Sequence, residues 1–207
     1  MRCLTVRQPY AWAIIHAGKN VENRTTNTVE KYFRECRNAG IPCIVAVHAG
    51  KTLDDGFFFW GRIPMLELSN ELWGTPIEDA LKAGERIQGS PGGLPVGTPP
   101  PTTLGAVIGA IEVVGVHESF ECQDTPYPPA PPVSRYCSPW AIGDQWHIEL
   151  ANPVALPAPV PCRGNLGLWT LPEDVALAVN LQLTTMGHPL VEVDGLVRML
   201  STTRTRP

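Results

Sequence analysis

The chain has 207 residues, enough for one domain with a sizeable hydrophobic core. It is 43% hydrophobic and 17% charged with a net charge of −4, which argues against a protein that coats nucleic acid non-specifically. The chain has no apolar run of the roughly 18 residues that a membrane span needs, so we expect no membrane partner. It also lacks the apolar core of a signal peptide, so we expect a cytoplasmic location.

The first part of the chain predicts a strand, a helix and a second extended segment. Apolar and polar residues alternate over 4–7, which indicates a short strand. Pro9 suits the first turn of a helix, and Gly18 suits its end. Residues 20–25, "NVENRT", follow as extended chain, in which successive side chains point to opposite sides.

The next segments alternate between helix, strand and irregular chain. Residues 29–40 predict an amphipathic helix, and the β-branched run at 41–50 predicts a buried strand. Residues 64–88 are typical of two short helices. The Pro- and Gly-rich stretch at 89–103 is expected to be a loop or a disordered insertion.

A long strand is expected at 104–119, where Gly109 and Gly115 are typical of bends or bulges. A second Pro-rich excursion follows at 122–139.

The C-terminal part predicts two shorter strands, a helix and a tail. The strands are expected at 145–151 and 166–171 with a Pro-punctuated edge between them, the helix covers 173–183, and the last dozen residues look like a tail. Four or five strands between helices and loops predict an α+β domain built around a small barrel.

The cysteine pattern gives no standard metal motif. Six cysteines, at positions 3, 36, 43, 122, 137 and 162, form no CxxC pair and are expected to be reduced and mostly buried. Cys36, Cys43 and His48 are conceivable zinc ligands, but their spacing fits no standard zinc site. Nothing in the spacing of His48 and His147 makes them a catalytic pair. We therefore expect neither a metal nor a cofactor.

Basic residues are concentrated in the first part of the chain. Residues 1–62 hold nine Lys and Arg against five Asp and Glu, whereas the remainder holds seven against fifteen. Four charged side chains lie around the first predicted helix: Arg7, Lys19, Glu22 and Arg24. Arginine binds phosphate bidentately, and a carboxylate accepts hydrogen bonds from a base amino group. The pattern predicts a cleft for a nucleotide base and its phosphate; the alternative is a solvated face with internal ion pairs.

Three further side chains have two interpretations each. Tyr10 and Trp12 are either stacking platforms for a base or parts of the core. Glu112, a carboxylate within an apolar strand, is either paired with a basic group or points into the cleft.

Four stretches of the chain resemble the ASCH domain family: "QPYAWAIIHAGKNVENR", "IPCIVAVHAG", "GAVIGAIEVVGV" and "PCRGNLGLWTL". The most specific part consists of Gln8, Pro9, Tyr10 and Ala11, followed by Gly18, Lys19, Glu22 and Arg24. The arrangement RQPYA is also similar to the EOLA-type ASCH proteins.

The resemblance covers about residues 2–171 and implies a PUA-like β-barrel of about five to six strands with flanking helices. It implies one ASCH domain over 1–183, with Pro-rich insertions at about 89–103 and 122–139. Residues 184–207 would then be a C-terminal extension.

The resemblance also implies a cleft beside the first helix that binds RNA, another single-stranded nucleic acid, or a nucleoside or nucleotide. Together with the residue patterns above, it gives this candidate binding set: Arg7, Gln8, Pro9, Tyr10, Trp12, Lys19, Glu22, Arg24 and Glu112.

A few small family members hydrolyse N4-acetylcytidine, so an amidohydrolase with Lys19 and Glu22 as catalytic residues is the alternative. Those members have a Thr three residues after the Lys, where this chain has Glu22. A carboxylate stabilises the ammonium form of the Lys and opposes nucleophilic attack, so binding is favoured. A third hypothesis is a protein-interaction module, since the Pro-rich sequence "PPAPP" favours an extended polyproline II ligand.

Overall fold

The computed structural model describes residues 1–53, 103–124, 136–138, 140–193 and 196–199. The predicted helices over 64–88 and most of both Pro-rich stretches lie outside these residues. In chain order the described elements are β1 (Arg2–Gln8), α1 (Tyr10–His16), β2 (Val21–Arg24), α2 (Glu30–Asn38), β3 (Cys43–Leu53), β4 (Ala106–Glu118), the 3₁₀-helix η1 (Ser119–Asp124), β5 (Trp146–Pro161), β6 (Leu168–Thr170), α6 (Glu173–Thr185), β7 (Leu190–Val193) and β8 (Leu196–Met199).

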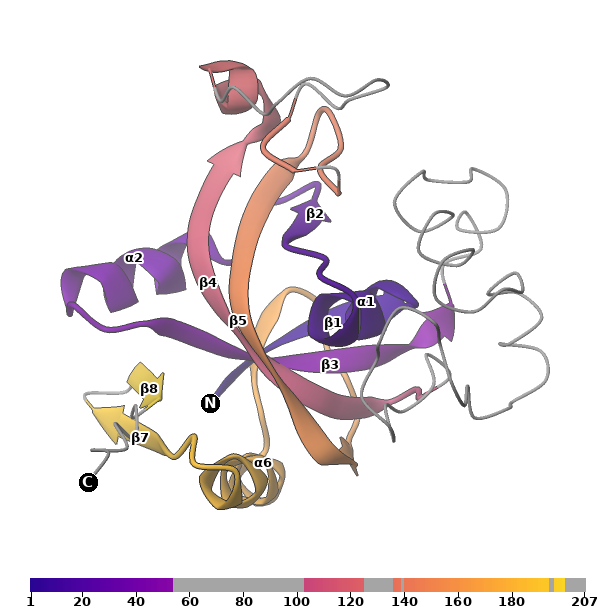
Figure 1. The fold of residues 1–207 in the computed structure, drawn as a ribbon, viewed down its shortest axis with the longest axis vertical. Coiled ribbons are helices and arrows are strands. Elements are labelled where there is room, and N and C mark those ends of the chain that lie inside the picture. The colour runs from indigo at the N-terminus through magenta and orange to yellow at the C-terminus, as the bar shows by residue number, and fades with distance from the viewer. Residues whose placement is uncertain (54–102, 125–135, 139, 194–195, 200–207) are drawn as a thin grey trace, which may run out of the picture.

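Six strands form one curled mixed sheet in the order β2-β5-β4-β3-β1-β6 (Figure 1). β1 runs parallel to β3, and the other neighbouring pairs are antiparallel. β7 and β8 form a separate two-stranded hairpin. The prediction of an α+β architecture around a barrel-like sheet is confirmed at this level.

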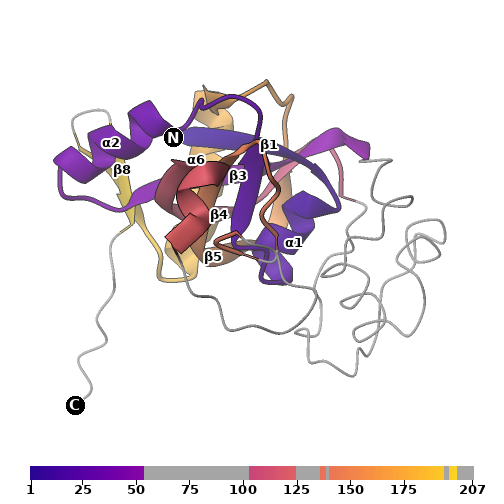
Figure 2. The ribbon, with the colours of Figure 1, turned by 90° about the horizontal axis from the view of Figure 1, so that it is seen from above.

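Both faces of the sheet pack against helices. One face packs on α1 and α2 through residues that include Ile14, Tyr32 and Val47. The opposite face packs on α6 through residues that include Ala46 and Val179. Because neighbouring residues of β3 face different layers, this strand needs a continuous apolar run. Figure 2 shows α1 and α2 well separated along the domain.

β5 is longer than the strand predicted at 145–151 and continues to Pro161. β2 pairs with its first part only, from Trp146 to Glu149. The later part of β5 therefore pairs with β4 on one side and has no described strand on the other. Prolines are tolerated at such an edge because their missing N–H breaks no ladder hydrogen bond there.

The bulges predicted at Gly109 and Gly115 are confirmed, since the register between β4 and β5 shifts beside both glycines. A Cβ atom on Gly109 would lie 2.6 Å from Ile15 Cδ1 and 2.7 Å from the Val154 carbonyl oxygen. The close approach of α1 to the sheet thus depends on this glycine.

The end of the described chain differs from the predicted tail. Leu196–Met199 form β8, in which Val197 is buried and Leu196 packs against the core on the α2 side. Strands of four residues are too short for a periodic signal, which explains the difference. None of the described helices combines the length and the apolar character that a membrane crossing requires.

Candidate functional site

Three of the predicted charged side chains meet in one group, which we call the β2 charge network (Lys19, Glu22 and Arg24). Lys19 Nζ lies 2.9 Å from Glu22 Oε2, and Arg24 Nη2 lies 3.1 Å from Glu22 Oε1. The three side chains are 3%, 10% and 23% exposed, respectively. Glu22 and Arg24 share one side of β2, as the period of two predicts. The cationic ends therefore converge on one carboxylate.

Lys19 has further contacts that favour its charged form. Its ammonium also donates a hydrogen bond to the Val21 carbonyl oxygen and lies 5.7 Å from the centre of the Tyr10 ring. Its backbone N–H donates to the Ala13 carbonyl at the end of α1, at 3.0 Å. A carboxylate, a carbonyl and an aromatic face all stabilise an ammonium ion. The network thus holds two cations against one anion.

Arg24 links the network to β1. Its Nη2 donates to the Thr5 carbonyl oxygen at 2.6 Å, while its buried Nε has no hydrogen-bond partner within the described part of the chain. Arg7 lies two residues beyond Thr5 and is exposed. Arg24 therefore contacts β1 two residues before Arg7, and arginine side chains suit an anion.

The junction between β1 and α1 contains three of the motif residues: Gln8, Pro9 and Trp12. Gln8 is fully buried; its Oε1 accepts from the Trp12 N–H at 3.0 Å and its Nε2 donates to the Thr103 carbonyl at 2.9 Å. Gln8 thereby satisfies a helix N–H that has no partner within α1. Pro9 directly precedes α1, and Trp12 is only 2% exposed. The core interpretation of Trp12 is the one that this burial favours.

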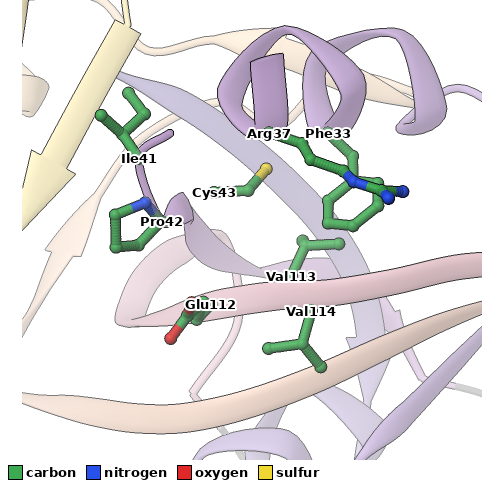
Figure 3. Close-up of a pocket in the computed structure, with 8 residues that line it drawn as sticks. All are labelled: Phe33, Arg37, Ile41, Pro42, Cys43, Glu112, Val113 and Val114. Atoms are coloured by element: carbon green, nitrogen blue, oxygen red, sulfur yellow. The ribbon is translucent and has the colours of Figure 1, made fainter. Parts of the chain in front are cut away.

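Glu112 is engaged elsewhere. It accepts a hydrogen bond from Asn152 Nδ2 at 2.7 Å and lines a cavity of about 290 Å³ between α2 and β4 (Figure 3). The cavity is otherwise lined by Phe33, Arg37, Ile41, Pro42, Cys43, Val113 and Val114. Figure 3 shows Arg37 and Glu112 on opposite sides of it. The structure thus brings Glu112 to a different surface from the β2 charge network.

The other side of β2 holds the segment that precedes β5. Asn23 Nδ2 donates to the Trp140 carbonyl at 2.8 Å, and Asn23 Oδ1 accepts from the Ile142 N–H at 2.9 Å. Ser138 donates to Asn20 Oδ1 at 2.5 Å. Within β2, Glu22 and Arg24 thus form the charge network on one side, while Asn23 on the other side and Asn20 just before the strand hold this segment.

Four side chains that no sequence motif predicts converge beside this segment: His117 at the end of β4, Cys122 in η1, Cys137, and His147 at the start of β5. Their ligand atoms all lie within 4.8 Å of one another. Burial, reinforced by Cys122, raises the pKa of the Cys137 thiol to about 12, and burial lowers the pKa of His147. We call them the Cys/His cluster.

The cluster could have been predicted from the pairing of β4 with β5. His117 and His147 stand directly opposite each other where β4 pairs with β5, and both cysteines lie in the chain between them. The conceivable ligands weighed from the sequence do not meet in this way. Cys36 and Cys43 are buried side by side in the core, and His48 Nε2 lies 3.2 Å from the Cys162 carbonyl oxygen.

Comparison of the chain with models of known protein families finds no match, and no curated protein matches it significantly. The functional assignment therefore depends on the geometry of its own side chains.

Proposed function

We propose that the chain is a cytoplasmic ASCH-type, PUA-like domain that binds RNA, another short single strand or a nucleotide at the β2 charge network. The burial of two cations around one carboxylate carries the proposal. Buried ion groups seldom stabilise a fold more than apolar residues of the same volume, so their presence calls for another role. Two cations around one carboxylate give the group a local positive charge, which suits an anionic ligand. The excess of basic residues over 1–62 supports the same assignment.

The chemistry of the network suits a base and a phosphate. Arg24 has an Nε without an acceptor among the described residues, and Arg7, two residues beyond the Thr5 carbonyl that Arg24 contacts, is exposed. Two planar donor groups can hold a phosphate bidentately. Each carboxylate oxygen of Glu22 accepts from one cation and keeps capacity for a second donor, such as the amino group of a base.

The same contacts weigh against Lys19 as a nucleophile. An attacking amine must lose its proton, whereas this ammonium is held by Glu22, the Val21 carbonyl and the Tyr10 ring. Binding is therefore favoured over the amidohydrolase alternative. Incubating the protein with N4-acetylcytidine should release no more cytidine than a Lys19→Ala variant does, as judged by chromatography.

The test of binding uses fluorescence anisotropy with a fluorescein-labelled, mixed-sequence single-stranded RNA of about ten nucleotides. Arg7→Ala and Arg24→Ala should each weaken binding at low salt by about fivefold or more, the contribution of roughly one phosphate contact. The logarithm of affinity should fall with the logarithm of salt with a slope of about two to three, because few phosphates are contacted. Cytidine monophosphate in place of the RNA separates nucleotide binding from strand binding.

Two arginines of α2 serve as matched controls. Arg34 is 63% exposed and paired with Glu30 at 3.7 Å, so Arg34→Ala should leave affinity unchanged. Arg37→Ala reports on the cavity beside Glu112. The site assignment is wrong if Arg7→Ala and Arg24→Ala bind like the parent chain while remaining folded, or if only Arg37→Ala weakens binding.

A further inference from the structure

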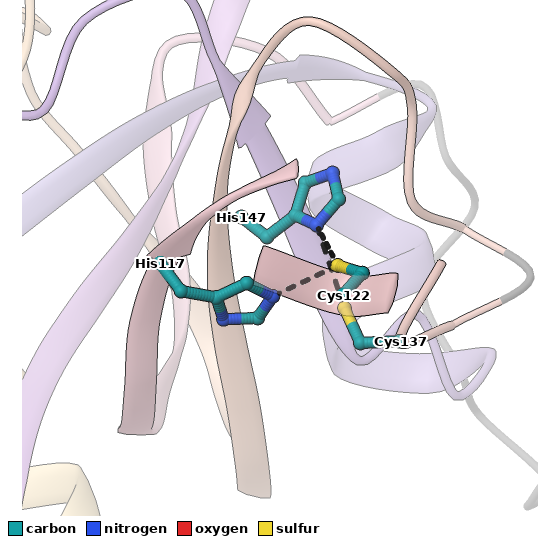
Figure 4. A group of neighbouring side chains, drawn as sticks. All are labelled: His117, Cys122, Cys137 and His147. Atoms are coloured by element: carbon teal, nitrogen blue, oxygen red, sulfur yellow. Dashed lines mark hydrogen bonds between the residues drawn. The ribbon is translucent and has the colours of Figure 1, made fainter. Parts of the chain in front are cut away.

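We propose that the Cys/His cluster is a structural zinc site, in which His117, Cys122, Cys137 and His147 bind one Zn²⁺ with tetrahedral geometry. Figure 4 shows the two imidazoles and two sulfurs pointing toward a common centre. The ligands come from four different places in the fold, so their convergence reflects tertiary structure. This inference is independent of the proposed nucleic-acid site.

The proton arrangement leaves lone pairs pointing inward. His147 Nε2 lies 2.8 Å from the Ile142 carbonyl oxygen, which can only accept, so Nε2 bears the proton and Nδ1 offers its lone pair to the cluster. His117 Nδ1 lies 3.6 Å from Glu149 Oε1, which favours the proton on Nδ1 and a lone pair on Nε2. Neutral imidazole nitrogens of this kind are metal ligands, and their outward partners are the usual second contacts of metal-binding histidines.

Within the cluster each inward-facing imidazole nitrogen has a thiol within hydrogen-bond distance. Cys122 Sγ lies 3.1 Å from His117 Nε2 and 3.1 Å from His147 Nδ1, but a thiol has a single proton to donate. Cys137 Sγ, at 3.5 Å, also faces His147 Nδ1. A divalent cation at the centre would replace both thiol protons and accept electron pairs from all four atoms.

The separations match a single ion. Zn–S bonds of about 2.3 Å and Zn–N bonds of about 2.0–2.1 Å place S and N about 3.6 Å apart in a tetrahedron. Three of the four N···S distances in the cluster are 3.1, 3.1 and 3.5 Å, and all ligand atoms lie within 4.8 Å of one another, so small movements of the side chains reach this geometry. A two-iron cluster with two His and two Cys ligands places the sulfurs and nitrogens on different irons. Here Cys122 Sγ contacts both imidazoles, which favours one metal ion.

The charge balance suits a buried site. Binding releases the thiol protons of Cys122 and Cys137, and the two thiolates neutralise the charge of Zn²⁺, with both imidazoles neutral. Cys122 and His147 are buried and the other two ligands are half-buried, so a neutral centre avoids the cost of an uncompensated charge. Four protein ligands leave no open position for water or substrate, which is typical of a structural site.

The expected consequence of the site is structural. The metal would join the end of β4, η1, the segment at 136–138 and the start of β5. Asn23 of β2 stands directly opposite His147 in the strand pair and also fixes Trp140 and Ile142. Zinc would therefore hold the segment against which β2 is anchored.

The first test measures metal in the purified full chain by mass spectrometry after expression in zinc-supplemented medium and dialysis. We expect about one zinc per chain, and at least a fivefold lower zinc content in Cys137→Ser and His117→Ala. Cys162→Ser is the matched control, because Cys162 is also half-buried but lies outside the cluster. Its zinc content should equal that of the parent chain.

The second test needs no variant at the ligands. Anaerobic reconstitution of the reduced, metal-depleted chain with Co²⁺ should give the visible bands of tetrahedral cobalt and a sulfur-to-cobalt charge-transfer band. Glu149→Gln should weaken zinc binding about tenfold in competition with a chelator, because it removes the carboxylate beside His117. Glu118→Gln, next to His117 in sequence, should not.

Several results would overturn the proposal. These are less than about one-tenth of a zinc per chain together with no tetrahedral cobalt spectrum, an equal loss of zinc in Cys162→Ser and Cys137→Ser, or a cobalt spectrum without the sulfur band. Stoichiometric iron or copper in place of zinc would overturn the choice of metal.

Discussion

The Lys19 ammonium and the Glu22 carboxylate lie 2.9 Å apart with only 3% and 10% of their side chains exposed. Arg24 binds the second oxygen of the same carboxylate at 3.1 Å, so Glu22 is the centre of the group. Removing this anion leaves two cations close together in a poorly solvated place. The energetic cost of that loss is the first prediction.

Glu22→Gln should lower the free energy of unfolding by about 2–4 kcal/mol, because a buried ion group that loses one partner keeps an uncompensated charge. The double variant Lys19→Met/Glu22→Gln should recover at least half of this loss, since it removes one of the stranded cations. Urea unfolding followed by circular dichroism gives both values.

An exposed ion pair provides the control for this experiment. Lys31 and Glu35 on α2 lie 4.0 Å apart with side chains 87% and 46% exposed. Glu35→Gln should therefore change stability by less than about 0.5 kcal/mol. If Glu22→Gln is as mild as Glu35→Gln, the network is more solvated than its burial indicates.

Gln8 should act on stability through its hydrogen bonds. Gln8→Met keeps the volume of this fully buried side chain but removes its bonds to the Trp12 N–H and the Thr103 carbonyl. Losing both hydrogen bonds should lower the free energy of unfolding by about 2–3 kcal/mol, as measured by urea unfolding. A Gln8→Met variant as stable as the parent chain would show that water replaces both bonds.

The sequence predicted the parts of this structure that depend on local periodicity. Alternation along β2 places Glu22 and Arg24 on one side, and the glycines of β4 mark its bulges. It could not predict that Glu112 lines the cavity between α2 and β4 instead of joining the β2 charge network, because that depends on how α2 packs on β4. The Cys/His cluster depends on the register that sets His117 opposite His147, which the sequence does not give. Its ligands are separated by four, fourteen and nine residues, and this spacing fits no standard metal motif.

His16 should make the fold sensitive to acid. Burial lowers its pKa from 6.5 to about 4, and its buried Nε2 has no hydrogen-bond partner among the described residues. Between these two pH values the unfolded chain binds a proton that the folded chain does not, so the free energy of unfolding falls as pH falls. The slope is at most about 1.4 kcal/mol per pH unit, and partial exposure of the ring limits the total to about 2 kcal/mol.

The measurement is urea unfolding at a series of pH values from about 7 to 4. His16→Phe removes the titrating group and should flatten the profile, leaving the smaller slope in the same direction from His48 and His147, whose pKa values burial also lowers. An unchanged profile in His16→Phe would assign the acid sensitivity to other groups.

Gly109 should be required for the close packing of α1 on the sheet. A methyl group at this position meets Ile15 Cδ1 at 2.6 Å and the Val154 carbonyl oxygen at 2.7 Å, and the latter is backbone of β5 that cannot rotate away. Gly109→Ala should therefore destabilise the fold by about 1–3 kcal/mol, the usual cost of overpacking. Gly50→Ala is the matched control, because its methyl group would come no closer than 3.4 Å to Thr5 or Val6. If the two variants unfold at the same urea concentration, then α1 can shift without cost. The position of Lys19 at the end of that helix would in that case be less fixed than its hydrogen bonds indicate.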